Sequence, residues 1–548
     1  MTTRSITHIL PTELIVRILM MLDYQSLLAC QQVCYLFNTL IAESSLLQYT
    51  LELAVAGKQD NPRSSLDFSR KLAVLRQHQA AWGALQWANT CDIPMLRGGL
   101  WELYGGVLAQ SDSDLTLRFR RLPSQIRGIE EYVWSVSTSD VDLRDFTMDP
   151  AQDLLVLIAR PRQHHALGTR LETAVHLRSL TTGNRHPLAP DPPILQHSVD
   201  AGVMEFSFVV QVCEDRVAVH FMSHEAVPSD LVVWNWKTGR KELNIHSHDL
   251  RAISFLSNRY MLVGGFDDRD RITEPRLYVI DLTKCDGQPV TLEDVNYRCA
   301  FAYPQCVPWV TPLGFQIRAD PMSPWVPPAS SDVPFFVDRD LRLLVITMYV
   351  AIGQELVSFD LFVLSRALLS LAEGLGSENV RHNFSWKDWG PENTRLMESP
   401  PHSQIWVCFV FGAKFVSLVH GGFELGGRVR TLEVWDFNAI GMQKERCQGV
   451  MDTTEVEGHP DIEWHDCDYS LVQHSVFLED IDTSLPYRVV RRDLPLQEQH
   501  WLRFAEALCS EDNIILVDVR SLVALVESAL MDRYPTQARH RNFRLLTF

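Results

Sequence analysis

The sequence lacks a paired-cysteine motif, a long apolar run and a secretion leader. Its 11 cysteines are scattered, with no Cys-x-x-Cys pair and no regular framework, which suits a reducing compartment where they act as small apolar core residues. The longest apolar run, 405–419, is too short to cross a bilayer and contains Lys414. Pro11 and Glu13 fall where a leader would have its apolar core. We therefore expect a soluble cytoplasmic or nuclear protein that does not bind membranes.

Catalytic signatures are also missing. The sequence contains no Gly-x-x-x-x-Gly-Lys-Ser/Thr, no Gly-x-Ser-x-Gly and no His-Glu-x-x-His. Five polar clusters resemble parts of functional motifs: His164-His165, His246-x-His248, Asp267-Asp268 with Asp270, His420-Gly421-Gly422 and His465-Asp466-Cys467. The first four lack the nucleophile, the glutamate or the ligand spacing that the complete motif needs, so turns, loops and a hairpin tip are the simpler interpretation. The fifth places a thiol near an imidazole, but adjacent residues on a strand point to opposite faces, and chance explains most such triplets. We expect no catalytic residue, no metal and no cofactor.

Negative charge is concentrated outside the first 90 residues. The net charge is −18, yet residues 1–90 carry +1 and the remainder, with 43 Lys/Arg against 62 Asp/Glu, carries −19. An acidic body repels phosphate backbones, so we expect no nucleic-acid ligand. The acidity is compatible with a basic protein partner, but many acidic proteins are acidic only for solubility, and this is the favoured interpretation. With 46% hydrophobic residues, the chain has the composition of a globular protein.

Residues 10–49 carry apolar side chains at helical spacing. Three stripes are present: Leu14, Ile15, Ile18, Leu19 and Leu22; Leu27, Leu28 and Val33; and Leu36, Phe37, Leu40 and Ile41. Pro11 suits a first helical turn, and Asp23 can cap a second helix. Three short helices cannot bury this much apolar surface between themselves, so a partner or the rest of the chain must cover some of it. An N-terminal helical cap on a larger domain is the alternative.

The same segment contains Leu10-Pro11-x-Glu13-Leu14, Ile18-Leu19, Leu22-Asp23, Leu27-Leu28, Val33-Cys34 and Phe37, in this order. This order and spacing resemble the F-box family over about 40 residues. The family often ends in Leu-Trp. Here Leu46-Leu47-Gln48-Tyr49 takes that place, an ending similar to those of mushroom-forming fungi.

An F-box implies docking onto the Skp adaptor of a cullin–RING (SCF-type) ubiquitin ligase. Carried over residue by residue, the docking surface would use Leu10, Pro11, Glu13, Leu14, Ile18, Leu19, Leu27, Val33, Cys34 and Phe37. Some of these side chains must instead hold the helices together, and the sequence does not separate the two sets. We place the F-box at residues 8–50.

Residues 51–95 continue with a helical pattern. Leu72, Leu75, Trp82 and Leu85 share one face, and Ser64 with Asp67 could form a weak capping box. We interpret this stretch as a helical linker that fixes the distance between adaptor and target. The alternative is that these helices only shield one edge of the next domain.

From about residue 99 the apolar pattern becomes that of short, paired strands. The pairs are 153–161 with 174–184, 215–222 with 230–240, 258–266 with 275–285, 339–349 with 356–366, 405–420 with 428–438, and 475–480 with 485–494. They recur about every 55 residues, a longer period than regular WD repeats. Two second strands, VVWNWKTG and LEVWDFNA, resemble the third strands of WD repeats, but no Gly-His opens a repeat.

These pairs predict a degenerate WD-like β-propeller over residues 96–548, in an α+β multidomain chain. With an early blade at 115–121 and a last one at 513–519, seven blades is the best count, with six or eight close behind. Residues 543–548 could pair with strands near 100–108 and close the ring, which would remove two exposed edges. A β-sandwich array is the main rival.

Two long insertions interrupt the pairs. Residues 304–334 contain eight prolines with Trp309 and Trp325, so we expect a surface segment and no central strand. Residues 372–404 carry Trp386 and Trp389. Loops on a rigid ring are common binding sites, but packing of these tryptophans onto the propeller is the favoured interpretation.

The sequence therefore favours a non-catalytic substrate-recognition subunit of an SCF-type ligase in ubiquitin-dependent degradation. The F-box would dock the adaptor, and the propeller would hold a target protein that the sequence does not identify. A protein-interaction scaffold without ligase function is the alternative, and a propeller enzyme is a more distant one.

Overall fold

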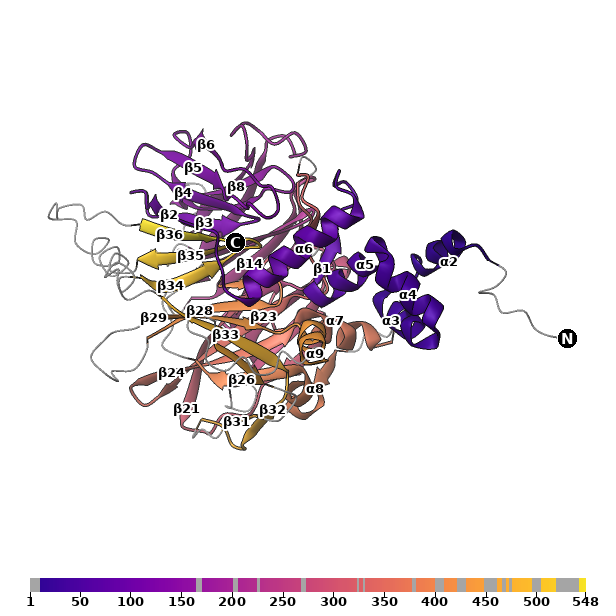
Figure 1. Cartoon of the computed structure of the whole chain (residues 1–548). Helices are drawn as coiled ribbons and strands as arrows, with labels where there is room; N and C mark the ends of the chain where they lie inside the picture. Colours follow the sequence, from indigo (N-terminus) through magenta and orange to yellow (C-terminus); the bar gives the residue numbers. More distant parts are fainter. Residues whose placement is uncertain are drawn as a thin grey trace, which may run out of the picture.

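A helical arm leads into a ring of β-sheets in the computed structural model of the chain (Figure 1). The structure describes residues 10–163, 170–200, 206–223, 227–267, 273–322, 325–328, 331–376, 381–399, 409–420, 430–447, 461–465, 470–472, 476–494, 504–518 and 542–548. The predicted class, N-terminal helices followed by an all-β propeller, is confirmed.

The arm begins with four short helices: α2 (Thr12–Leu19), α3 (Tyr24–Val33), α4 (Tyr35–Glu43) and α5 (Ser45–Ala56). Asp23 caps α3 as predicted, since its Oδ1 accepts a hydrogen bond from the Ser26 backbone N at 2.7 Å. The helices enclose a small core of five buried side chains: Ile15, Leu19, Leu27, Ile41 and Leu47. Because Leu47 comes from α5, this core is built by four helices, whereas the sequence predicted three helices.

The arm then joins the ring through a strand and a long helix. The strand β1 (Lys58–Asp60) pairs with β22 (Phe335–Val337) of the ring, and α6 (Phe68–Gly83) follows. Asp67 caps α6 by accepting from the Arg70 backbone N at 2.9 Å, so the predicted capping box beginning at Ser64 is absent. The predicted apolar face of this stretch is buried.

Seven antiparallel sheets form the blades of the ring, and the first strand of each blade lines the central channel. From the channel outward, blade 1 contains β3 (Trp101–Tyr104), β4 (Val107–Ser111), β5 (Thr116–Arg121) and β6 (Tyr132–Ser137); blade 2 contains β7 (Leu143–Asp149), β8 (Leu154–Ala159), β10 (Arg170–Ser179) and β11 (Ile194–Asp200); blade 3 contains β12 (Phe206–Cys213), β13 (Arg216–Ser223), β14 (Ser229–Asn235) and β15 (Arg240–Ser247).

Blades 4 to 7 continue the order. Blade 4 contains β16 (Leu250–Phe255), β17 (Tyr260–Asp267), β18 (Glu274–Asp281) and β20 (Tyr297–Ala302), and blade 5 contains β21 (Val310–Arg318), β23 (Leu343–Ile352), β24 (Glu355–Leu364) and β26 (Thr394–Glu398). Blade 6 contains β27 (Val410–Phe411), β28 (Lys414–His420), β29 (Arg430–Asp436) and β33 (Tyr487–Asp493), and blade 7 contains β34 (Phe504–Cys509), β35 (Asn513–Asp518), β36 (Asn542–Thr547) and β2 (Asn89–Pro94). The two sequences resembling WD third strands are indeed third strands, β14 and β29.

Shorter elements decorate the blades. They are β9 (Arg162–Gln163), β19 (Pro289–Val290), β25 (His382–Phe384), β30 (Asp461–His465), the hairpin of β31 (Ser470–Val472) with β32 (Ile481–Thr483), the 3-10 helix η2 (Leu282–Lys284), and the helices α7 (Ser365–Gly374), α8 (Trp386–Asn393) and α9 (Ala439–Cys447). The predicted pairing of 475–480 with 485–494 is wrong. Instead β33 is the fourth strand of blade 6, where it pairs with β29 and β30, and Val476 accepts a backbone hydrogen bond from Val307.

The ring closes between the two ends of the sequence. The C-terminal strand β36 pairs with β35 on one side and with β2 on the other. Closure by a C-terminal strand was predicted, but its partner is 89–94 and not 100–108, because the strands near 100–108 are the inner strands of blade 1. The propeller thus begins inside the 51–95 stretch that was expected to be helical linker, and β2 covers an edge that would otherwise be exposed.

The two insertions contain regular structure that the sequence did not predict. Residues 310–318 form β21, the channel strand of blade 5, so the expectation of a surface segment is wrong there. Pro312 fits because it lies at a register shift of a strand that pairs on one side only. In the second insertion, α8 and β26 replace the expected loop, and Trp389 is fully buried with its Nε1 donating to the Ala302 carbonyl at 2.9 Å. Trp309, by contrast, is exposed.

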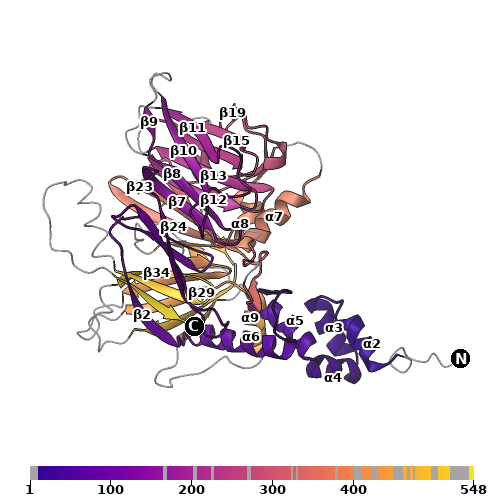
Figure 2. The ribbon, with the colours of Figure 1, turned by 90° about the horizontal axis from the view of Figure 1, so that it is seen from above.

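The arm packs on one face of the ring (Figure 2). The strand pairing, the ion pairs with Glu511 and Lys444 and the Asn438 hydrogen bond involve ring segments that connect a first strand to a second, or a third to a fourth: 335–337 and 511 belong to the first kind, and 438–447 to the second. Strands alternate in direction within a blade, so these connections share one face. The starts of the channel strands therefore lie on the opposite face, away from the arm.

Candidate functional site

The arm exposes an apolar surface far from the ring, which we call the helical patch: Leu14, Ile18, Met21, Leu28, Val33 and Tyr35. Leu14, Ile18 and Met21 follow one another at i, i+4 and i+7 and so form one stripe along α2 and its C-terminal end. Val33 and Tyr35 flank the junction between α3 and α4. Met21 is 86% exposed and Tyr35 84% exposed, which is unusual for large apolar side chains in such close succession.

The structure separates the ten predicted docking residues into three groups. Pro11, Glu13, Leu14, Ile18 and Val33 are exposed; Leu10, Cys34 and Phe37 are half-buried; Leu19 and Leu27 are buried in the core of the arm. A partner can therefore reach the first group directly, whereas Leu19 and Leu27 hold the helices together. Sequence reasoning missed Met21 and Tyr35. The helical spacing from Leu14 and Ile18 could have indicated Met21.

A buried ionic cluster attaches the arm to the ring. Lys58 of β1 forms an ion pair with Glu511, and His78 of α6 lies with its Nε2 3.1 Å from the Glu511 carbonyl and 3.3 Å from Asp512 Oδ1. Arg127 of blade 1 donates to Asp512 Oδ2 at 2.8 Å. We call these five residues the seam cluster. All five side chains are buried, so the cluster excludes water between arm and ring.

Charges within the seam cluster shift its titration. Burial opposes ionisation of Asp512, but the charge of Arg127 and a hydrogen bond from His78 outweigh it and lower its pKa to about 2. Burial lowers the pKa of His78, although Asp512 opposes this change. A neutral His78 then donates from Nε2 to the Glu511 carbonyl.

Further hydrogen bonds connect α5 to the ring. The Asn438 Nδ2 donates to the Val55 carbonyl at 2.7 Å, and Lys444 Nζ on α9 contacts Glu52 Oε2 at 2.6 Å. The Tyr49 hydroxyl donates to the Pro334 carbonyl at 3.0 Å. With a strand pairing, buried charges and these contacts, the arm projects from the ring at a fixed angle.

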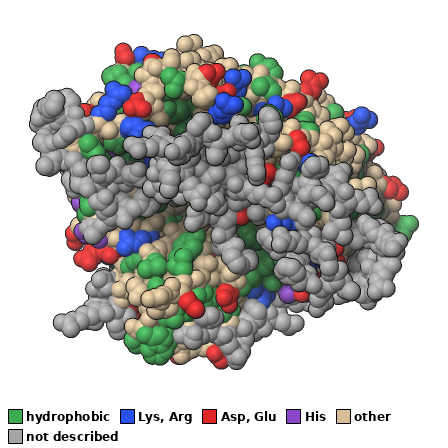
Figure 3. Space-filling view, turned by 90° about the vertical axis from the view of Figure 1, so that its left-hand side faces the viewer, with side chains coloured by type: hydrophobic (Ala, Val, Ile, Leu, Met, Phe, Trp, Pro, Cys, Tyr) green, Lys and Arg blue, Asp and Glu red, His purple; other side chains and the backbone are tan. Residues whose placement is uncertain are grey.

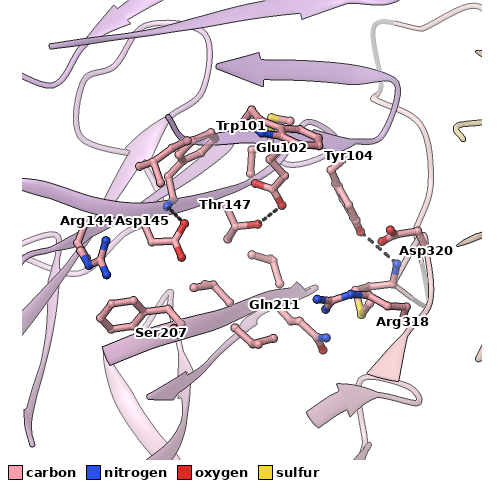
Figure 4. A pocket seen from close by; sticks show the side chains of 18 of the residues that line it. Trp101, Glu102, Tyr104, Arg144, Asp145, Thr147, Ser207, Gln211, Arg318 and Asp320 are labelled. Atoms are coloured by element: carbon pink, nitrogen blue, oxygen red, sulfur yellow. Dashed lines mark hydrogen bonds between the residues drawn. The ribbon is translucent and has the colours of Figure 1, made fainter. Parts of the chain in front are cut away.

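The central channel contains a cavity of about 380 Å³ between the channel strands of blades 1, 2, 3 and 5 (Figure 4). Its charged lining residues are Glu102, Arg144, Asp145, Arg318 and Asp320. Residues 319–322 close the end near the arm, where the Met322 backbone N donates to the Tyr104 hydroxyl at 3.2 Å and the Gly412 backbone N donates to the Asp320 carbonyl at 2.7 Å. The cavity therefore leads toward the face opposite the arm, which Figure 3 views directly.

Two carboxyl groups in the cavity have raised pKa values. Burial raises the pKa of Glu102 well above its usual range; a hydrogen bond from Thr147 opposes this, and the charges of Asp145 and Asp320 add to it. Burial also raises the pKa of Asp145 to about 6, against a hydrogen bond from the Phe146 backbone N and the charge of Arg144. Sequence reasoning found neither residue, because they come from strands of different blades and belong to no motif.

The polar clusters of the sequence do not assemble a site in the part of the chain that the structure describes. His246 lies on β15, where its Nδ1 contacts Asp230 Oδ1, and Asp267 lies 3.4 Å from Arg276. His164-His165, Asp268, Asp270, Gly421-Gly422 and Asp466-Cys467 lie outside the described residues. Among the described residues, no three potential ligands gather in a metal-binding group, and no helix has the length and apolar character to span a membrane.

Comparison with known proteins identifies the arm. Residues 7–49 match the F-box-like family. No curated protein matches the chain. Among solved structures, Hsv2 from Kluyveromyces lactis is 12% identical, with 55% of this chain and 72% of that chain covered and a TM-score of 0.22. Sqt1 from Chaetomium thermophilum is 12% identical, with 60% and 78% covered and a TM-score of 0.24. The chain thus combines an F-box-like N-terminal segment with a seven-blade β-propeller.

Proposed function

We propose that this protein is the substrate-recognition subunit of an SCF-type cullin–RING ubiquitin ligase. The observation that carries the proposal is the helical patch, which lies in an F-box-like segment and is covered by no described part of the chain. Its exposed members, with Pro11 and Glu13, would dock the Skp adaptor. Burying such side chains contributes roughly 1.5–3 kcal/mol each, before the entropic cost of association is subtracted.

The attachment of the arm supports this role. A receptor accelerates ubiquitin transfer by holding the target lysine near the ligase, and this requires a fixed geometry between adaptor and target. The seam cluster and the β1–β22 pairing supply a rigid connection, and the other face of the ring points away from the arm. The chain itself would contribute binding and positioning and no covalent chemistry. From the cysteine pattern, we also propose a cytoplasmic or nuclear location.

Co-purification tests the proposal. The tagged full chain is expressed with the Skp adaptor and cullin, and is expected to retain both. Ile18→Asp should abolish retention of the adaptor. Leu356→Asp is the matched control: Leu356 is also apolar and exposed, but it lies at a hairpin of blade 5 and not in the helical patch, so its substitution should leave retention unchanged. Failure of the unaltered chain to retain the adaptor, with the protein folded, would exclude ligase function and favour a scaffold with another partner.

A further inference from the structure

The central cavity contains a carboxylate oxygen with no partner. Glu102 Oε1 accepts a hydrogen bond from Thr147 Oγ1 at 2.8 Å, but Oε2 is buried and has no hydrogen-bond partner. Among the described residues, no Lys, Arg or His forms an ion pair with Glu102. Buried polar atoms are nearly always paired, and leaving a carboxylate oxygen unpaired is costly. Such an orphaned group in a cavity indicates a ligand that supplies hydrogen-bond donors.

The cavity wall offers further acceptors around Glu102. Each channel strand pairs with a neighbour on one side only, so β3, β7, β12 and β21 turn their other edge, with its backbone N–H and C=O groups, toward the channel. Asp145 adds a second carboxyl group, and the rings of Trp101 and Phe208 line the same space. Carboxylate and carbonyl oxygens suit an ammonium or a guanidinium, while the aromatic walls suit an aliphatic stem.

The cations already in the cavity lie at its two ends. Arg144 belongs to the start of β7, and Arg318 to the end of β21. These strand positions place them on opposite sides of Glu102 along the channel, and Figure 4 shows the three side chains separated in this way. Negative charge is therefore least compensated at the middle of the cavity. An anion would find neither arginine there, and its charge would oppose ionisation of Glu102.

We propose that the cavity binds a lysine or arginine side chain presented by a segment of the target protein. The inference rests on the proposed function, because it assigns the target to the face opposite the F-box-like arm. A volume of about 380 Å³ accommodates one long side chain with part of its backbone. It also assigns a role to the acidic body of the chain, which would attract a basic segment toward this face.

Peptide binding tests the proposal with the full chain. The ligands are immobilised peptide pools with one central position fixed as lysine, arginine, norleucine or glutamate. Retention on the lysine and arginine pools should exceed that on the norleucine pool at least tenfold. Glu102→Gln should reduce lysine-pool retention to the norleucine level, whereas Glu355→Gln, at an exposed hairpin, should leave it unchanged. If Glu102→Gln does not fold, Asp145→Asn provides the same test.

Retention on the lysine pool should also increase as the pH rises from 5 to 8, since Glu102 and Asp145 must lose protons to pair with the cation. The other charged or titratable groups around them are Tyr104, Arg144, Arg318 and Asp320.

Equal retention on the lysine and norleucine pools, preference for the glutamate pool, or unaltered retention by both cavity variants would overturn the proposal. The proposal would also be overturned if a blocked lysine amide bound as tightly as the peptides of the lysine pool, because the occupant would then be a small amine and not a segment of a protein. Adaptor binding by the same samples separates the two proposals. Adaptor binding without lysine preference overturns only this inference, and lysine preference without adaptor binding overturns only the ligase function.

Discussion

Arg127 and Asp512 join the first blade to the last beneath the F-box-like arm. The Arg127 guanidinium donates to Asp512 at 2.8 Å and to the Phe335 carbonyl at 2.7 Å, so one side chain connects blade 1, blade 7 and the segment that pairs with β1. Ring closure and attachment of the arm thus depend on the same buried charges, so removing Arg127 or Asp512 should loosen the ring and the arm together.

Arg127→Met should therefore destabilise the protein strongly. It leaves Asp512 buried without its main counter-charge, and removing one partner of a buried pair costs about 3–5 kcal/mol. Thermal and urea unfolding of the full chain measure the loss. Lys387→Met is the control, since it breaks an exposed pair with Glu479 and should cost less than about 1 kcal/mol. Equal effects of the two variants would show that the seam cluster is not structural.

Stability should fall as the pH decreases from about 6.5 toward 5, in part because of His78. Its folded pKa is lowered, so the unfolded chain takes up a proton in this range before the folded protein does, and acid favours unfolding. The pKa of Asp512 is about 2 in the folded protein, so its contribution to stability is lost only as the pH falls below 3.8, its ordinary pKa. In His78→Gln the slope of stability against pH between 7 and 5 should be shallower. The exposed His248→Gln should keep the original slope, and the same slope in both variants would contradict this assignment.

Phe548→Ala should also loosen the arm. The Phe548 ring is fully buried and stacks on Trp82 of α6, with ring centroids 4.3 Å apart and an angle of 14° between the planes. Truncation of a buried phenylalanine costs about 3–5 kcal/mol. Hydrogen exchange should accelerate in α6 as well as in blade 7, whereas Leu188→Ala at an exposed site should change neither. Faster exchange confined to blade 7 would show that the contact does not hold the arm.

Glu102→Gln should stabilise the protein at pH 8. The folded pKa of Glu102 is raised, so the folded state keeps its proton while the unfolded state loses it, and stability decreases as the pH rises above about 4.5. Glutamine removes this loss and can still accept from Thr147. Unfolding midpoints of the variant and the original chain should differ at pH 8 and converge near pH 4. A variant less stable at pH 8 would contradict the account of the cavity.

Much of the fold followed from local patterns. Apolar stripes and Asp23 located the arm helices, and alternation located pairs such as β8–β10 and β13–β14, because both patterns report burial of a single element. The closing strand β2 did not stand out, since Asn89–Pro94 has little alternation and its role depends on a partner 450 residues away. Pro312 similarly concealed β21, because a bulge at a channel edge tolerates proline.

The two sites differ in how far they could be predicted. The helical patch lies within 22 residues of sequence. The family resemblance named Leu14 and Ile18, which are exposed, but only packing could assign Leu19 and Leu27 to the core. The cavity joins Glu102, Thr147 and Arg318 from three blades. No spacing in the sequence brings such residues together, and only closure of the ring does.

Equilibrium binding of purified Skp adaptor to the purified full chain tests the central claim most directly. We expect saturable one-to-one binding that Ile18→Asp weakens tenfold or more, equivalent to about 1.4 kcal/mol or more, and that Leu356→Asp leaves unchanged. Absence of binding by the folded chain, or equal binding by Ile18→Asp, would contradict the claim that the helical patch docks the adaptor.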